Sequence, residues 1–124
     1  MRLGPLVLWP SVRGRASRTE DEHWGYMVKA PVVLPARVEV VLAIAPGAAS
    51  LASFQHGGFV AAVRFEACPA HEPAFAYRGT VGSYTGFPFA IAIRRRSACV
   101  PMDLWVDGRA TPLRRIVPVG RRSC

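Results

Sequence analysis

The sequence predicts an all-β protein, a small antiparallel β-sandwich or open barrel with a mobile N-terminal arm. Three observations support this prediction. Apolar residues alternate with polar ones at a period of two along several segments, and no segment carries a stripe at the 3.6-residue helical period. The 124 residues include 11 Gly and 11 Pro spread along the chain, which favours short segments joined by turns. We count about six or seven short strands, a number typical of such folds.

Residues 1–25 are predicted to form the arm, and residues 26–124 a single β-sandwich domain. The arm carries basic and then acidic clusters without apolar periodicity. These clusters are Arg13, Arg15, Arg18, Glu20, Asp21 and Glu22. Residues 1–10 make a poor signal peptide, because prolines interrupt the apolar run and arginines follow it. We therefore expect that, if the domain is exported, its signal or anchor lies upstream of this start.

The central strands are predicted from alternation. Residues 38–44, between Pro35 and Pro46, have the pattern of a half-buried strand. Residues 50–58 are expected to form a loop. Residues 59–68 form a second strand with Arg64 and Glu66 on its outer face, and Cys68 closes it. A third strand directs four apolar side chains inward: Phe87, Phe89, Ile91 and Ile93.

A C-terminal hairpin is the best-specified element. Residues 98–106 alternate strictly, and Asp107-Gly108 follows as the signal for a type I′ turn. This turn would pair Leu104 with Thr111, Met102 with Leu113 and Val100 with Arg115. It would also place Arg114 diagonal to Asp103, within reach of a weak ion pair. Prolines cannot donate to a ladder, so at least one strand here is expected to be an edge.

Three cysteines, Cys68, Cys99 and Cys124, are disulfide candidates, and their odd number leaves one thiol over. A bridged terminal cysteine would indicate an oxidising compartment, whereas three reduced thiols would fit a cytosolic domain. The predicted register places Cys99 opposite Ile116. A Cys99–Cys124 bridge therefore requires the chain to reverse near Gly120. Connectivity stays open, with a preference for Cys68 bonded to Cys124 and Cys99 unpaired.

The formal net charge is +8, and the chain from Arg94 onward holds eight arginines against two aspartates. This excess could attract an anionic surface, either membrane headgroups or a wall polymer. Alternatively, it could neutralise nucleic-acid phosphates, with Tyr77, Tyr84 and Phe87 stacking on bases. The basic-face candidates are Arg94, Arg95, Arg96, Arg114, Arg115, Arg121 and Arg122.

The sequence signals for other kinds of site, metal-binding or catalytic, are weaker. Cys68 and His71 could hold zinc together with His23 or His56, but a fourth ligand at recognisable spacing is missing. The same pair matches no known nucleophile signature. As candidate nucleophiles, Ser50 and Ser53 lack a marked base nearby. As a candidate acid–base pair, Glu66 and Glu72 have no reason to share a pocket. The glycines form no phosphate-binding motif. We assign no catalytic, cofactor-binding or metal-binding residue.

A resemblance covers residues 60–124 and depends on the spacing of Cys, Gly and Pro. The chain resembles a group of small uncharacterised actinobacterial proteins that are exported or membrane-anchored. The resemblance implies a β-rich domain outside the cell and brings no activity. The matching segments are Val63-Arg64-Phe65-Glu66-Ala67-Cys68-Pro69, Gly79-Thr80-Val81-Gly82, Thr85-Gly86-Phe87, Cys99-Val100-Pro101, Val106-Asp107-Gly108, Arg114-Arg115 and Gly120-Arg121-Arg122-Ser123-Cys124.

Together these observations predict a non-enzymatic β domain, exported or at the cell surface, that serves as a structural or binding module. Its ligand and oligomeric state are not determined by the sequence. The alternative is a cytoplasmic basic β-barrel that binds nucleic acid through the C-terminal arginines.

Overall fold

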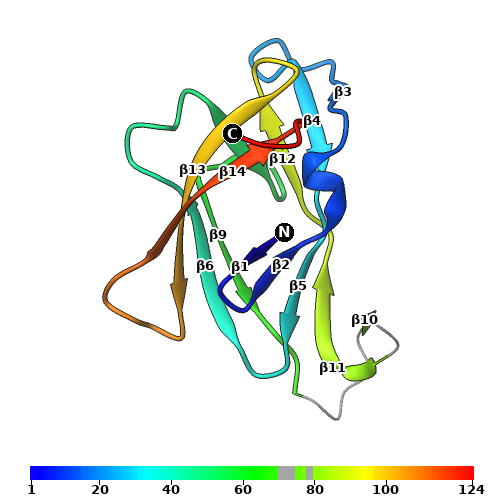
Figure 1. Cartoon of the computed structure of the whole chain (residues 1–124), viewed down its shortest axis with the longest axis vertical. Helices are drawn as coiled ribbons and strands as arrows, with labels where there is room; N and C mark the ends of the chain where they lie inside the picture. The colour runs from blue at the N-terminus through cyan, green and yellow to red at the C-terminus, as the bar shows by residue number, and fades with distance from the viewer. Residues whose placement is uncertain (70–74, 78–79) are drawn as a thin grey trace.

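The computed structural model describes residues 1–69, 75–77 and 80–124, and there it consists of short antiparallel strands in three sheets (Figure 1). None of the sheets closes into a barrel within the described residues, so the architecture matches the predicted sandwich. The helical part of the described chain is a single 3-10 turn, η1 (Pro10–Arg13). No helix there is long and apolar enough to cross a membrane.

The first sheet has the strand order β1-β2-β5-β11-β10. Its strands are β1 (Arg2–Leu3), β2 (Leu6–Leu8), β5 (Val32–Pro35), β11 (Thr80–Phe87) and β10 (Phe75–Tyr77). The second sheet has the order β3-β4-β12-β7-β8. Its strands are β3 (Ser17–Arg18), β4 (Tyr26–Lys29), β12 (Ala90–Ile93), β7 (Ala52–Gln55) and β8 (Phe59–Val60).

A single two-stranded antiparallel ribbon runs through both of these sheets. β11 pairs with β5 and β12 pairs with β4 in the same antiparallel register, and the Ala30 N–H donates to the Phe89 carbonyl between them, at 2.9 Å. In this register Pro31 lies opposite Pro88. Neither proline has an N–H to donate, so the ladder is interrupted at this point.

The third sheet has the order β14-β13-β6-β9. Its strands are β14 (Leu113–Val119), β13 (Ala98–Val106), β6 (Glu39–Ile44) and β9 (Ala62–Glu66). β14 is an edge strand, as the prolines predicted. β6 and β9 occupy the two central alternating segments predicted from sequence, and their inward side chains Val40, Leu42, Val63 and Phe65 are buried.

An aromatic cluster joins the sheets at the core. The ring of Phe65 in β9 lies 5.2 Å from Phe87 and 5.4 Å from Phe89, and Phe54 in β7 lies 5.1 Å from Phe89. Ring separations in this range are favourable for tilted and edge-to-face contacts. The inward direction predicted for Phe89, Ile91 and Ile93 is confirmed by their burial.

Residues 1–25 differ from the mobile arm predicted for them. Leu6, Leu8 and Val12 are fully buried, β1 and β2 extend the first sheet, and β3 pairs with β4. The turn at Gly4 also packs against Leu113 of β14. Every residue of β2 is buried, so its sequence does not alternate, and the period-two criterion misses it.

The predicted loop at residues 50–58 contains strand β7 for the same reason. Ala52, Ser53 and Phe54 are all buried between β12 and β8, so no alternation marks the strand. The predicted single strand at 59–68 is divided into β8 and β9, which belong to different sheets. Phe59, expected to point inward, is exposed.

The hairpin forms, but its register is shifted by two residues. Asp107 and Gly108 both have positive φ, and the Arg109 N–H donates to the Val106 carbonyl, as a type I′ turn requires. Pairing then resumes only after Pro112, with Leu104 opposite Leu113. The register also sets Met102 opposite Arg115, Val100 opposite Val117 and Cys99 opposite Pro118. A shift by an even number preserves which face each side chain occupies.

Candidate functional site: an arginine-rich end closed by a disulfide

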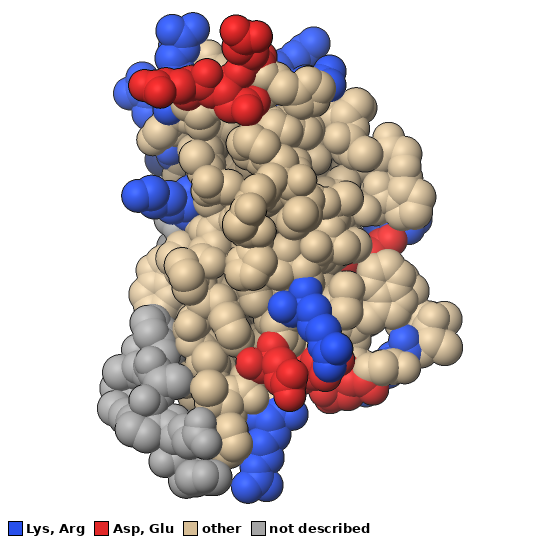
Figure 2. Space-filling model, turned by 180° about the vertical axis from the view of Figure 1, so that it is seen from behind, with Lys and Arg blue, Asp and Glu red and all other residues tan. Residues whose placement is uncertain are grey.

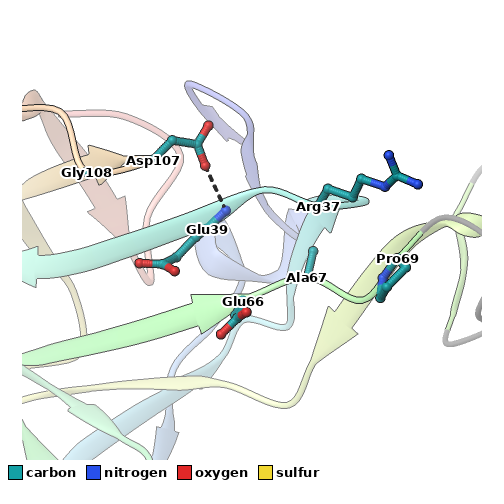
Figure 3. A pocket seen from close by; sticks show the side chains of 7 residues that line it. All are labelled: Arg37, Glu39, Glu66, Ala67, Pro69, Asp107 and Gly108. Carbon is teal, nitrogen blue, oxygen red and sulfur yellow. Dashed lines mark hydrogen bonds between the residues drawn. The ribbon is translucent and has the colours of Figure 1, made fainter.

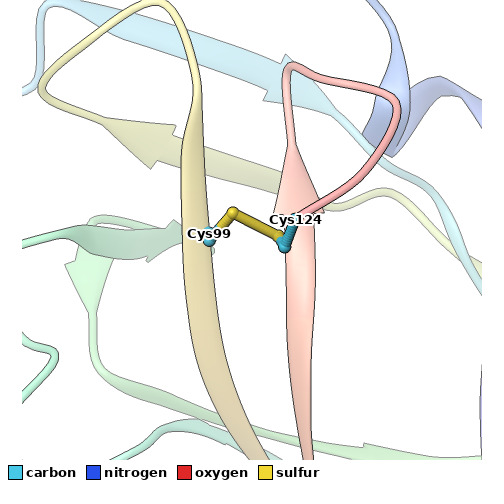
Figure 4. Close-up of a disulfide and its surroundings, with 2 residues drawn as sticks. All are labelled: Cys99 and Cys124. Atoms are coloured by element: carbon cyan, nitrogen blue, oxygen red, sulfur yellow. A yellow bond between two sulfur atoms is a disulfide. The ribbon is translucent and has the colours of Figure 1, made fainter.

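Cys99 in β13 and Cys124 at the end of the tail are joined by a disulfide, with their Cα atoms 5.7 Å apart (Figure 4). This separation lies within the normal range for disulfides. The preferred Cys68–Cys124 pairing is therefore wrong in the structure, and Cys68 is the free thiol. Cys68 follows β9 near the other end of the third sheet, where its N–H donates to Thr85 Oγ1.

Gly120 produces the chain reversal that the Cys99–Cys124 bridge requires. Its φ is +69°, and its N–H donates to the Val12 carbonyl at 2.9 Å. A Cβ atom at this position would lie 2.6 Å from the Arg96 carbonyl oxygen. Glycine is therefore needed both for its positive φ and for the close approach of two backbones. The contact brings the tail against the turn between β12 and β13.

Five of the seven basic-face candidates meet at this end. Arg94, Arg95 and Arg96 form the turn between β12 and β13, and Arg121 and Arg122 lie in the tail that the disulfide holds beside it. All five are exposed. We call these five residues, together with the turn and the tail that carry them, the arginine-rich end.

Arg94 is held by side chains from the loop before β4. Its Nη2 lies 2.8 Å from His23 Nε2, and its guanidinium carbon lies 5.7 Å from the ring centroid of buried Trp24. This geometry fits a cation–π interaction. Asp21 Oδ1 orders the loop by accepting the backbone N–H groups of His23 and Trp24. The contacts of Arg94 were not predicted, because they join residues 70 or 71 positions apart.

Tyr26 lies between two further guanidinium groups. Arg96 and Arg18 donate hydrogen bonds to its hydroxyl and lower its pKa below the ordinary value for tyrosine. Arg18 stands directly opposite Tyr26 in the β3–β4 pair. The N-terminal segment thus adds a basic residue to the arginine-rich end.

Acidic residues border this end. Glu20, Asp21 and Glu22 lie in the loop between β3 and β4, whose His23 contacts Arg94. Figure 2 shows Lys or Arg and Asp or Glu side chains next to one another at the upper end of the molecule. The basic surface is therefore local, and the whole end is not uniformly positive.

Arg114 and Arg115 lie apart from the other five candidates, toward the start of β14. Arg114 Nε and Nη2 each lie 2.7 Å from a carboxylate oxygen of Asp103, which stands directly opposite and is only 2% exposed. The Arg114 hydrogen bonds hold the pKa of Asp103 below its usual range, against the effect of burial. The predicted weak diagonal pair is thus a bidentate bond across the ladder, because the register shifted.

A cavity of about 620 Å³ lies at the opposite end of β13 (Figure 3). Its charged lining residues are Arg37, Glu39, Glu66 and Asp107. Glu39 and Glu66 stand opposite each other in the β6–β9 pair, and Arg64 lies 2.7 Å from the first and 4.0 Å from the second. Asp107 Oδ1 accepts the Glu39 N–H at 3.0 Å. Sequence reasoning missed this acidic group, since it depends on strand pairing.

The remaining candidates do not form a chemical site among the described residues. His71 and Glu72 lie outside these residues, and no group of three potential metal ligands is found within them. His23 contacts Arg94, and the His56 ring packs near Phe65. The Ser53 hydroxyl donates to the Val60 carbonyl.

Of the proposed stacking residues, Phe87 contacts Phe65 of the core, so its ring does not form an open platform. Tyr84 is half-buried in β11, and Tyr77 ends β10. Comparison of the chain with protein-family models, curated proteins and solved structures finds no match in any of the three.

Proposed function

We propose that this chain is a non-enzymatic β domain that works outside the reducing cytosol, exported or at the cell surface, and binds anionic surfaces through its arginine-rich end. The observation that carries the proposal is the placement of Cys124 against Cys99. Disulfides persist mainly in oxidising compartments. The resemblance to exported actinobacterial proteins agrees with this location.

The arginine-rich end supports the choice of an anionic partner. Arg95, Arg121 and Arg122 are exposed, and no carboxylate of the described chain forms an ion pair with them. Guanidinium groups match phosphate geometry and lose little hydration on binding. A membrane with anionic headgroups, or an anionic wall polymer, would supply the matching charge.

The location is tested by counting thiols in protein isolated from its native cells. Alkylation before reduction should modify one cysteine, Cys68, and alkylation after reduction should modify all three. Peptide mapping should then identify Cys99 and Cys124 as the protected pair. Three modified cysteines before reduction, in protein recovered from the cytosolic fraction, would contradict the proposal.

The partner is tested by sedimentation with vesicles. Vesicles containing phosphatidylglycerol should bind the protein at low ionic strength, and vesicles of phosphatidylcholine alone should not. Binding should weaken as salt rises, because the interaction is between exposed charges. A mixed-sequence oligonucleotide serves as the competitor. Tighter binding to the oligonucleotide than to every anionic vesicle and wall polymer would favour the nucleic-acid alternative instead.

A further inference from the structure

A second cavity, of about 470 Å³, lies within the arginine-rich end. Three separate segments line it: the loop before β7, the turn between β12 and β13 with the start of β13, and the C-terminal tail. The lining residues are Ser50, Leu51, Arg94, Arg95, Ser97, Ala98, Cys99 and Arg121. Sequence reasoning identified the arginines, considered Ser50 only as a nucleophile, and missed Leu51 and Ser97; only the fold brings these three residues to the arginines.

The lining has the composition of a phosphate site. It offers three guanidinium groups and two hydroxyl groups, and none of its residues is acidic. Arginine can donate two parallel hydrogen bonds to a phosphate, and serine hydroxyls add further donors. Arg94 is already oriented by His23 and Trp24, so part of the ordering cost is met before a ligand arrives.

The segment that carries Arg121 is tied at both ends. Gly120 is bound to Val12 through its backbone, and Cys124 is bonded to Cys99, itself a lining residue. Between these two points only three residues intervene. Without the disulfide, Arg121 to Cys124 would form a free terminal segment, and such segments are poorly ordered unless attached.

We infer that this cavity binds a phosphodiester group of an anionic surface and that the Cys99–Cys124 disulfide holds Arg121 in position for it. The inference rests on the proposed function, for which it names the ligand class and the binding residues. Two sources of phosphodiester groups at a cell surface are glycerophospholipid headgroups and poly(glycerol phosphate) wall polymers, and the oligonucleotide competitor covers the nucleic-acid alternative. Leu51, a lining residue that is 43% exposed, provides an apolar contact that a lipid could use.

The test compares affinities of matched variants for phosphatidylglycerol vesicles and for soluble poly(glycerol phosphate). Arg121→Ala should lower affinity about tenfold, the loss of roughly one charge-assisted hydrogen-bonded contact. Arg122→Ala removes the neighbouring charge, which does not line the cavity, and should lower affinity only about twofold. Equal losses of affinity in the two variants would contradict the proposal that the cavity is the binding site. They would indicate instead a general attraction of the protein to anions.

The role of the disulfide is tested with a Cys99→Ser, Cys124→Ser double variant. It should bind as weakly as Arg121→Ala, and combining all three substitutions should cause little further loss, because both changes remove the same contact. Circular dichroism before titration establishes that each variant is folded. Full wild-type affinity in the folded double variant would contradict the proposal that the disulfide holds Arg121 in position.

Reduction offers an independent check on the wild-type protein. Dithiothreitol supplies two electrons and two protons to the Cys99–Cys124 bond, giving two thiols while the reagent closes to its own disulfide. Affinity should fall to that of Arg121→Ala and should not change in the Arg121→Ala variant itself. Stronger binding to the vesicles identifies a headgroup and stronger binding to the polymer a wall component. Absence of binding to either, by every form of the protein, would overturn the proposed function together with this inference.

Discussion

At the Val106 end of β13 the carboxylates have partners within the fold, whereas at the Ala98 end several arginines have no acidic partner in the described chain. Glu39 is bonded to Arg64, and Asp107 accepts a backbone N–H. At the other end Arg95 and Arg121 line a cavity without carboxylates. Both cavities contain charged residues, but the one at the Val106 end is lined by carboxylates together with Arg37, whereas arginines are the only charged residues that line the one at the Ala98 end. A cavity whose only charged residues are arginines is the better candidate for an anionic ligand.

The two ends also differ in how they are closed. The Val106 end is closed by a type I′ turn and by the Asp107 contacts with Glu39, all of them non-covalent. Arg37 there has a φ of +64° and points away from the carboxylates in Figure 3. The Ala98 end is closed by a covalent bond from the chain terminus. Reduction of the disulfide therefore acts on the closure of the Ala98 end and not on that of the Val106 end.

The largest expected effect comes from removing the disulfide. The Cys99→Ser, Cys124→Ser double variant should lose about 3.5 kcal/mol of unfolding free energy, because the closed loop of 25 residues no longer restricts the unfolded chain. Urea denaturation measures the loss. Cys68→Ser is the matched control and should change stability by less than about 1 kcal/mol. A larger effect of Cys68→Ser would reverse the assignment of the free thiol.

Gly120→Ala should cost about 2–3 kcal/mol, from its positive φ and from the contact of the new methyl group with the Arg96 carbonyl. Gly57→Ala is the control, because Gly57 has a similar φ of +66° but no atom within 4 Å of an added Cβ. Its cost should be about 1–2 kcal/mol. If thermal denaturation gives equal losses, the tail does not press against the β12–β13 turn.

Arg114→Ala should destabilise the protein by about 1–3 kcal/mol, the cost of leaving the buried Asp103 carboxylate without its partner. Since the pKa of Asp103 is lowered in the fold, the contribution is present above the unfolded value near 4 and is lost as pH falls through the folded value. The difference from wild type should therefore shrink in acid. Arg115→Ala, the exposed neighbour, should show neither the loss nor the pH dependence.

Arg64→Ala should have the smallest effect. It leaves Glu39 and Glu66 opposite each other as like charges, so the denaturation midpoint should fall slightly at low salt. The fall should disappear at high salt, because all three groups are accessible to solvent. A Glu66→Gln change in the same protein should restore the midpoint. A loss that persists at high salt would show that Arg64 contributes through packing and not through charge.

The sequence predicted those parts of the fold in which one face is buried and the other exposed. β6, β9 and β13 alternate in polarity, so their faces are readable without a structure. β2 and β7 are buried on both faces, and this removed the alternation by which they could be found. The hairpin turn was predicted from Asp107-Gly108, but the two-residue shift in register was not, because strand pairing resumes only after Pro112, with Leu104 opposite Leu113.

The features of the candidate site likewise fall into those that the sequence predicted and those that it could not. The arginines and the terminal cysteine are visible in the sequence, and so is the requirement that the chain reverse near Gly120. The partner of Cys124, the separation of Arg114 from the other arginines and the approach of Ser50 to Arg121 are not visible there. Each depends on residues far apart in the chain that only sheet packing brings together. Local pattern thus determined the alternating strands and the charges, and tertiary structure decided where the fully buried strands lie and which of those charges meet.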